Sequence, residues 1–574
     1  MFKLKFFIIV FICCLLKFNV VLAIHKDQLF ILNIDNFVFQ HPVVDTVDNY
    51  LKFLVLRPLF TYDLQNNLKC DWCVKFPSEE NGYLKLITEN KVNKMLINIK
   101  LKESAKWADG TAITANDFVF SYNLYLENKS ESYKYWWMDY IDSVVPDSSD
   151  AQKLSIKIIG HDKSLLHFLT MFFIIPYHLE SKVWKEDSFE NISLYFKNTS
   201  YLKKLDIQGL YNGPFFIKKH DSINKIIYLE QNPYFVYNKP LFQHIIFKYQ
   251  ASLDDFISLI KDNNKLVMVK DFLYLASSLQ DKFINYWQNN NNNIHEWYDF
   301  KCQDIDAYEV IIFNLRNPIF KDKRLLKLLW HNINKETIEK DIFKNIYPLL
   351  YSLKTINRDN IFDKILKLTL NDKLSPDLLN LLEWDRSVKD NLLYKDNIKL
   401  QLTLDVVKLH PLRKKLFKIL KLQLNRVGVD LMLHNDFDDE MNSDIVERSN
   451  FKDIALLSWV ISDFQKIPRV LFHSKEIASY DNNYRGLNIG AWHNYNVDKL
   501  LDLQDRPNKS NSHKSINIEE EFLKEYTKDL PFIPLFAHKH CVVIHKYLKN
   551  YSFLNRVFPS SSLYIETWGI NNVN

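Results

Sequence analysis

Cysteine and histidine residues stand close together at two places in the chain, and both spacings are ones that support chemistry. CDWC (70–73) has the spacing of a redox-active pair or of half a zinc site. HKHCVVIH (538–545) would place His538 and His540 on one face of a strand, where paired imidazoles are common metal ligands. The two candidate chemistries are therefore thiol redox and metal binding.

Neither segment has the partners that its chemistry needs. A lone cysteine pair cannot supply four zinc ligands, and no thioredoxin-like βαβ pattern surrounds Cys70 and Cys73, so we expect a local disulfide or two free thiols. Adding Cys541 and His545 to the histidine pair would require both faces of the strand or a bend. We therefore expect strand histidines near a surface, with no metal and no cofactor.

Other catalytic patterns are missing as well. The 9 glycines form no nucleophile elbow, dinucleotide fingerprint or phosphate-binding loop. HEWYD (295–299) lacks the second histidine of a zinc protease motif, and the acidic run at 438–440 reads as a solvated surface. The sequence therefore favours binding over catalysis, and the protein is not expected to be an enzyme. An exported hydrolase is the alternative, supported only by the two clusters above.

The first 23 residues have the pattern of an export signal. Lys3 and Lys5 precede an apolar run of eleven residues, and Ala23 ends the segment with a small side chain. Eleven residues are too few to cross a bilayer core, although an uncleaved anchor that continues past Lys17 is the alternative. We expect residues 1–23 to be a cleaved signal peptide and the protein to be periplasmic.

The charge balance of the exported part argues against nucleic acid as a partner. The full chain of 574 residues carries a formal charge of +5, and removal of residues 1–23 takes away three lysines and no acid, which leaves 5 − 3 = +2. A basic stripe of the kind that nucleic acid requires is not indicated. Hydrophobic residues make up 47%, enough for two or three cores.

Several segments have clear periodicity. Residues 28–42, 93–101 and 152–159 alternate as strands do, and residues 214–235 read as a hairpin. Thr114 and Asp117 form a capping pattern that starts a helix after the Asp109-Gly110 turn. Residues 309–315 are typical of a buried strand, and residues 320–333 have helical spacing. Residues 398–433 read as strand, helix and strand, which predicts an α/β lobe with parallel strands.

The segment KWADGTAITANDFVFSY (106–122) resembles the signature of the family 5 extracellular solute-binding proteins, the peptide-binding components of ABC importers. Further segments resemble that family in the same order along the chain: RPLFTYDL (57–64), IIPYHL (174–179), the hairpin at 211–235, FNLRNPIFKDKRLLKLLWHNINKETI (313–338) and LPFIPLFAHK (530–539). The likeness covers most of the exported chain.

The resemblance implies an α/β bilobal periplasmic-binding-protein fold, type II, of the large peptide-binder class, with an extra subdomain. Lobe I would comprise residues 24–58, 200–306 and 534–574, the subdomain residues 59–199, and lobe II residues 307–533. The implied function is delivery of peptides to an ABC permease in the inner membrane by a monomer. The same fold with a metal chelate, haem or a peptide-like antibiotic as ligand is the alternative.

In relatives an extended peptide pairs with strand edges between the lobes, which close over it. Two segments match by position: the strand exit at Phe37, Val38 and Phe39, and LSWVISDF (457–464). In the second segment, Ser458 stands where relatives have glycine, Trp459 matches, and Val460 follows on the strand. Asp463 is the candidate partner of a peptide ammonium, or else a turn residue. Arg485 and Asn488 resemble an Arg-x-x-Asn element near the cleft, where Arg485 would pair with a ligand carboxylate or remain an exposed loop residue.

Overall fold

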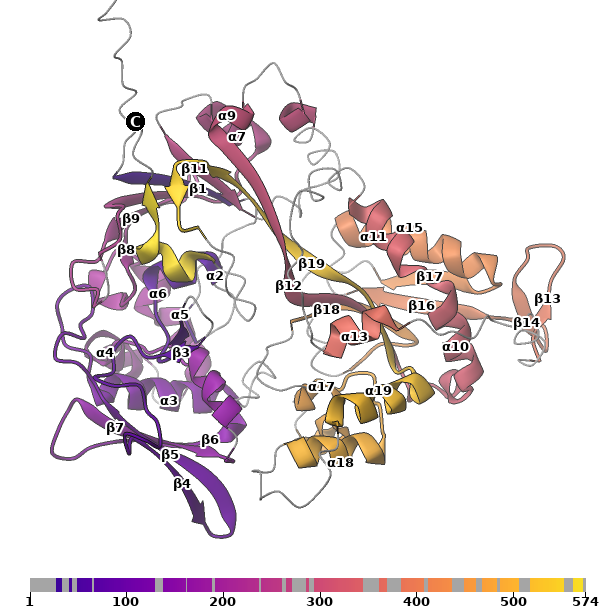
Figure 1. The fold of residues 1–574 in the computed structure, drawn as a ribbon, viewed down its shortest axis with the longest axis horizontal. Coiled ribbons are helices and arrows are strands. Elements are labelled where there is room, and N and C mark those ends of the chain that lie inside the picture. The colour runs from indigo at the N-terminus through magenta and orange to yellow at the C-terminus, as the bar shows by residue number, and fades with distance from the viewer. Residues whose placement is uncertain are drawn as a thin grey trace, which may run out of the picture.

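One ten-stranded sheet runs through the whole molecule in the computed structural model (Figure 1). The structure describes residues 27–33, 41–43, 49–63, 67–129, 138–161, 163–187, 191–236, 239–260, 265–270, 285–288, 294–343, 361–368, 383–406, 411–435, 449–460, 467–482, 486–504, 517–551 and 561–570. In sheet order the strands are β17 (Asp430–Asn435), β16 (Gln401–Val406), β18 (Ile454–Val460), β12 (Tyr298–Phe313), β19 (Phe532–His545), β11 (Leu266–Lys270), β1 (Gln28–Asn33), β10 (His244–Lys248), β9 (Ile226–Gln231) and β8 (Phe215–Asp221).

Two long strands at the centre of this sheet connect the two halves of the molecule. β12 has 16 residues and β19 has 14, and the two pair in antiparallel fashion along almost their whole length. In Figure 1 they run together from the half that contains β1 to the half that contains β16. The short apolar run at 309–315 predicted only the last part of β12, because the earlier part alternates with charged residues.

The buried apolar side chains form two clusters. The first combines residues 29–268 with residues 542–568, and the second comes mainly from residues 287–543. The C-terminal part of the chain therefore returns to the core that the N-terminal part begins. This is the discontinuous arrangement that the resemblance implied for lobe I, although the individual domain boundaries stay a prediction.

The early chain builds a separate four-stranded sheet below lobe I, in the order β4 (Leu84–Glu89), β5 (Val92–Lys100), β7 (Lys153–Ile159) and β6 (Ile141–Pro146). Helix α3 (Ala115–Lys129) lies against it and begins at the predicted cap. The Asp117 carboxylate accepts hydrogen bonds from the backbone N–H of Thr114 (2.7 Å) and of Tyr177 (2.8 Å), the first residue of α4 (Tyr177–Asp187). The capped start of α3 is thus as the sequence predicted, and the same carboxylate also holds the first residue of α4.

Lobe II contains the predicted β-α-β unit. β16, helix α15 (Pro411–Arg426) and β17 follow one another, and the two strands pair in parallel. Gly428 ends the helix with a φ of +88°, a conformation that residues with a Cβ rarely adopt. The other α-helices described between residues 323 and 529 are α10 (Lys323–Asn332), α11 (Lys335–Phe343), α13 (Ile361–Lys367), α17 (Arg469–Phe472), α18 (Tyr495–Gln504) and α19 (Ile518–Asp529).

Both pairs of cysteines in the described chain form disulfides. Cys70 and Cys73 are joined across two residues, which is one of the two outcomes that the sequence left open. Cys302 and Cys541 are also joined, although 239 positions separate them in the sequence. Because they are direct register partners on β12 and β19, this second bridge lies across the central strand pair.

The last described residues pack against the start of the chain. The Glu566 carboxylate pairs with Arg57 at 2.8 Å, and both side chains are buried. The Ser562 hydroxyl donates to the backbone oxygen of Tyr50 (2.7 Å) in helix α2 (Asn49–Val55). Asp71, held inside the Cys70–Cys73 loop, is also buried and lies 4.0 Å from Arg57. These late residues therefore close the core of lobe I.

Candidate functional site

The pairing of β12 with β19 is interrupted near the middle of both strands. Asp304 pairs with Lys539 and Tyr308 pairs with Ala537, so residues 305–307 of β12 stand opposite the single residue His538. Extra residues of this kind bend a strand and increase its local twist. The interruption is therefore the natural bending point between the two halves of the sheet.

Strands from both lobes end at this bending point and run toward each other. In lobe I, β11 runs toward the interruption and ends at Lys270. Lys270 pairs with Val542 of β19, and Val542 also pairs with Lys301 of β12 on its other side. In lobe II, Val460 at the end of β18 pairs with Ala307 and also points toward it. The two ends are six residues apart along β12 but only four residues apart along β19, because residues 305–307 stand opposite His538 alone. Carboxyl ends of strands are where open α/β sheets bind ligands.

In the described parts of the chain, the last residues of β18 pair with a strand on only one side. β12 pairs with β18 from Ile454 to Val460, whereas β16 pairs only with residues 454–456. Within the residues that the structure describes, no strand pairs with residues 457–460 on the side where β16 lies. Backbone groups in such an edge can pair with an added extended chain. Ser458, Trp459 and Val460, all predicted site residues, form this edge.

The Ser458 side chain belongs to a buried ionic cluster made of Glu309, Arg413, Ser458 and His538. Arg413 holds the Glu309 carboxylate with two bonds, from Nε at 2.6 Å and from Nη2 at 3.0 Å. The Ser458 hydroxyl donates to Glu309 Oε2 (2.8 Å) and accepts from Arg413 Nη2 (2.7 Å). His538 Nε2 lies 3.0 Å from the same carboxylate oxygen and 3.0 Å from the Ser458 hydroxyl.

This ionic cluster is charged and enclosed. Glu309 is fully buried, and Arg413 and His538 are about 5% exposed or less. Burial alone would raise the pKa of Glu309, but the Arg413 charge and the hydrogen bonds from His538 and Arg413 hold that pKa well below its usual range. His538, considered above as a metal ligand, is thus occupied by Glu309 and Ser458, and the His540 side chain lies outside the described residues.

Trp459 faces the opposite side of the sheet and is 9% exposed. Its indole packs edge-on against Phe362, Phe472 and Phe532, with ring centroids 5.2–6.0 Å apart. Tyr308 stacks on Phe362 from the same face. The sequence resemblance predicted that Trp459 contacts the ligand. In the structure its indole packs into the aromatic core of lobe II, while its backbone lies in the edge described above.

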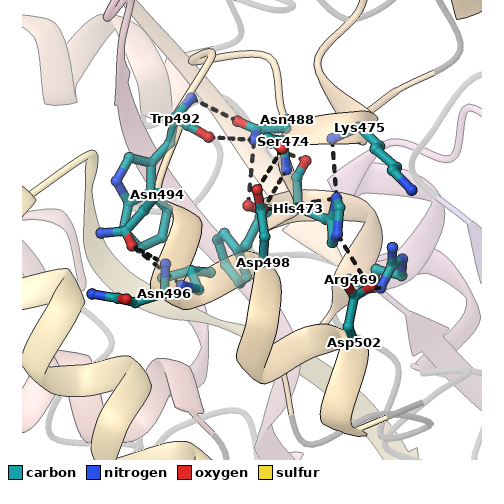
Figure 2. Close-up of polar contacts among 12 residues, drawn as sticks. Arg469, His473, Ser474, Lys475, Asn488, Trp492, Asn494, Asn496, Asp498 and Asp502 are labelled. Atoms are coloured by element: carbon teal, nitrogen blue, oxygen red, sulfur yellow. Dashed lines mark hydrogen bonds and ion pairs between the residues drawn. The ribbon is translucent and has the colours of Figure 1, made fainter. Parts of the chain in front are cut away.

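Asn488 lies in a loop that its own side chain holds together (Figure 2). Its Nδ2 donates to the backbone oxygens of Trp492 (2.9 Å) and His473 (3.2 Å), and its Oδ1 accepts from the Trp492 N–H (3.0 Å). Gly486 comes so close to the preceding turn that a Cβ would lie 1.8 Å from the Glu476 oxygen. A ligand contact by Asn488 stays a prediction.

Polar side chains of α17 and α18 fasten the same loop to the rest of lobe II (Figure 2). Asp498 accepts from the backbone N–H and the hydroxyl of Ser474 at 2.8 and 2.5 Å, and Asp502 accepts from Arg469 at 2.9 Å. Burial and the nearby Arg469 charge lower the pKa of His473, which lies between these groups. The segments that carry Asn488 and His473 are thus held in place by side-chain hydrogen bonds.

The remaining predicted site residues lie outside the described residues. These are Phe37, Val38 and Phe39 after β1, Asp463 after β18, and Arg485, and the same holds for the side chain of Val460. The sequence reasoning did not find the ionic cluster around Glu309, because its members come from four elements distant in the chain. The only local signal is a charged residue at the start of the apolar run EVIIFNL (309–315).

No group of three or more histidine, cysteine, aspartate or glutamate residues in the described parts of the chain has a metal-binding arrangement. None of the described helices is both long and apolar enough to span a membrane. What the site offers is an open strand edge at a bending point between two lobes. This combination defines a bilobal binding protein of mixed α/β structure.

Comparison with known proteins identifies the class. Residues 86–474 match the family described as bacterial extracellular solute-binding proteins, family 5 Middle. The chain is 23% identical over 502 residues to the oligopeptide-binding protein AppA of Bacillus subtilis (strain 168), a match that covers 82% of this chain and 80% of AppA. The chain therefore belongs to the family 5 extracellular solute-binding proteins.

Two solved structures show the same fold over nearly the whole chain. An oligopeptide-binding protein from Thermus thermophilus, complexed with a pentapeptide, has a TM-score of 0.69 at 16% identity and covers 96% of this chain and 97% of its own. NikZ from Campylobacter jejuni, in complex with Ni(L-His), has a TM-score of 0.64 at 20% identity and covers 95% and 99%. The predicted bilobal fold is confirmed by these likenesses.

Proposed function

We propose that this protein is the periplasmic substrate-binding component of an ABC importer, and that it binds peptides between its lobes and delivers them to a permease. The observation that carries the proposal is the open edge of β18 at residues 457–460, beside the bending point. An added peptide strand there would gain backbone hydrogen bonds that do not depend on its sequence. The relatives named for oligopeptide binding, and the signal-like residues 1–23, support the same role.

The direct test is ligand-dependent stabilisation of the mature protein. Copurified ligand is first removed by unfolding and refolding, and melting is then followed with a pool of short peptides. A ligand that binds only the folded state raises the free energy of unfolding by roughly 3 kcal/mol when its concentration is one hundred times Kd, and Tm rises accordingly. A protein that melts at the same temperature with every peptide pool does not bind peptides.

A metal chelate is the second candidate ligand, because the likeness to NikZ in complex with Ni(L-His) extends over nearly the whole fold. The same refolded protein is therefore melted with nickel and histidine together, and with each alone. Stabilisation only by the mixture would favour the chelate, and stabilisation only by peptides would favour the first candidate. Native mass spectrometry of the protein as isolated identifies any ligand carried through purification.

The predicted ammonium site is tested at Asp463. The substitution Asp463→Ala should weaken binding of free-amine peptides about tenfold or more, and binding of acetylated peptides much less, because only the free amine is charged. Glu103→Ala, a change of an exposed acidic residue in the subdomain, is the matched control. Equal losses for free-amine and acetylated peptides would rule out the ammonium role.

A further inference from the structure

A buried arginine links residues 561–570, called the late segment below, to the start of the chain. Arg57 follows helix α2 and donates from Nη2 to the backbone oxygen of Leu563 (2.9 Å) and to the Glu566 carboxylate (2.8 Å). Its guanidinium also donates to the backbone oxygen of Phe53 inside the helix. The position of the Arg57 side chain therefore decides how the late segment is attached to lobe I.

A second carboxylate reaches the same guanidinium from the loop that the disulfide closes at residues 70–73. Asp71 Oδ2 lies 4.0 Å from Arg57 Nε, and both side chains are fully buried. Lys69 Nζ lies 3.2 Å from the other oxygen of Asp71. Among the described residues, Asp71 and Glu566 are the two carboxylates in ionic contact with Arg57. Two positive and two negative groups therefore balance one another at this place.

The Asp71 carboxylate has no hydrogen bonds of its own to keep it there. Neither of its oxygens accepts a hydrogen bond from any residue that the structure describes. A buried carboxylate without hydrogen bonds is unfavourable compared with one in water. The disulfide closes residues 70–73 into a ring and so keeps the side chain turned inward. If the ring were opened, the Asp71 carboxylate could turn toward water and be solvated.

The late segment also contacts the hairpin that leads into this loop. The Tyr564 hydroxyl donates to the backbone oxygen of Asp63 (3.1 Å), which lies between β2 (Thr61–Tyr62) and β3 (Leu68–Lys69). The first cysteine of the loop follows β3 directly, and both cysteines belong to the same apolar cluster as the late segment. The disulfide loop and the late segment are thus parts of one core.

We propose that the disulfide at residues 70–73 controls how firmly the late segment docks on lobe I, and that it acts through Asp71 and Arg57. With the loop closed, Asp71 balances part of the Arg57 charge and fixes the guanidinium that holds the late segment. With the loop open, Asp71 leaves, the buried guanidinium keeps only Glu566 as a charged partner, and the late segment is held less firmly. This device does not depend on which ligand the protein binds.

The state of the loop is set by a two-electron reaction. Oxidation of the two thiols forms one S–S bond and passes two electrons and two protons to a protein disulfide, which is itself reduced to two thiols. Such exchange requires access to a sulfur, but Cys70 is 9% and Cys73 is 3% exposed in the closed molecule. A thiol-oxidising reaction therefore has to act on the chain before lobe I is closed, in an oxidising compartment such as the periplasm.

Amide hydrogen exchange of the ligand-free protein tests the coupling. In the double variant Cys70→Ala/Cys73→Ala, the late segment should exchange about tenfold faster or more, while β10 (His244–Lys248) stays protected and shows that lobe I is folded. The matched control is Cys302→Ala/Cys541→Ala. It opens a much longer loop and should therefore cost at least as much global stability, yet it should leave the late segment protected. Equal loosening in both variants, or full protection in the first, would overturn the inference.

A second variant separates Asp71 from the disulfide itself. Asp71→Asn keeps the loop closed and the side chain nearly the same size but removes its charge, so it should also loosen the late segment, whereas Glu103→Gln on the exposed surface should not. Added to the cysteine double variant, Asp71→Asn should change the exchange little further, because the carboxylate has already left Arg57.

No loosening by Asp71→Asn, or losses that add in full, would show that the disulfide does not act through Asp71 and would overturn the inference. Asp71→Asn alone still decides the question if the cysteine variant does not fold. Because no ligand is used, the result is independent of whether peptides bind.

Discussion

Removing the negative charge of Glu309 should destabilise lobe II strongly, and removing Arg413 as well should restore much of the loss. Glu309→Gln keeps the size of the side chain but leaves the Arg413 guanidinium, which is 4% exposed, without its charged partner. Breaking one half of a buried pair costs about 3–5 kcal/mol, whereas replacing both halves by uncharged groups is often nearly neutral. The double variant Glu309→Gln/Arg413→Met should therefore recover at least about 2 kcal/mol of the loss.

The same cluster predicts a direction of pH dependence. The pKa of Glu309 is lower in the folded protein than in the unfolded chain, so the folded state binds fewer protons at acid pH. Its contribution to stability is complete above the unfolded pKa and is lost as pH falls. Between about pH 5 and pH 3, the unchanged protein should therefore lose more stability than the double variant.

Urea denaturation followed by tryptophan fluorescence measures both effects, since Trp330, Trp459 and Trp492 all lie in the second apolar cluster. The four proteins of the cycle are the unchanged chain, the two single variants and the double variant. Strictly additive losses would show that Glu309 and Arg413 do not interact energetically. A single variant as stable as the unchanged chain would refute the reasoning that the Arg413 charge needs its partner.

Three further substitutions test other parts of the structure. Burial raises the pKa of Asp117 to about 6, although hydrogen bonds from Thr114 and Tyr177 act in the opposite direction. Lowering the pH from about 7 to 5 should therefore stabilise the unchanged protein but not the variant Asp117→Asn, and melting curves of the two proteins across this range test the difference. Phe362→Ala should cost about 3–5 kcal/mol in urea denaturation, because its ring is fully buried among four other aromatic rings; a loss below about 1 kcal/mol would mean that the site repacks. Asn488→Ala should cost about 1–3 kcal/mol by leaving buried backbone groups unpaired, and a loss of ligand affinity without a loss of stability would instead indicate direct ligand contact.

The elements that the sequence predicted are those encoded by short contiguous patterns. The capped helix at α3, the hairpin of β8 and β9, and the β16–α15–β17 unit each depend on residues within about forty positions of one another. Alternation and capping act over such distances, so they can be read from one sequence. The strand predicted at 28–42 is confirmed for Gln28–Asn33, and most of the rest of it lies outside the described residues.

The site was harder to predict because it is assembled from distant segments. The sequence resemblance pointed to residues 457–464, and the structure shows that, among the described residues, β16 pairs with β18 only as far as Leu456. No local pattern indicates that Cys302 faces Cys541, or that Arg413 reaches Glu309 across 104 positions. Burial of a charge is visible only once the strands around it are placed.

The position of β19 in the sheet has a consequence for how the molecule is made. This strand comes late in the chain, at Phe532–His545, yet it lies between β12 and β11 at the middle of the ten strands. Until it is synthesised, the strands on either side of it have no shared partner and remain two unjoined groups. The ten strands can therefore join into one sheet only after nearly the whole chain has been made.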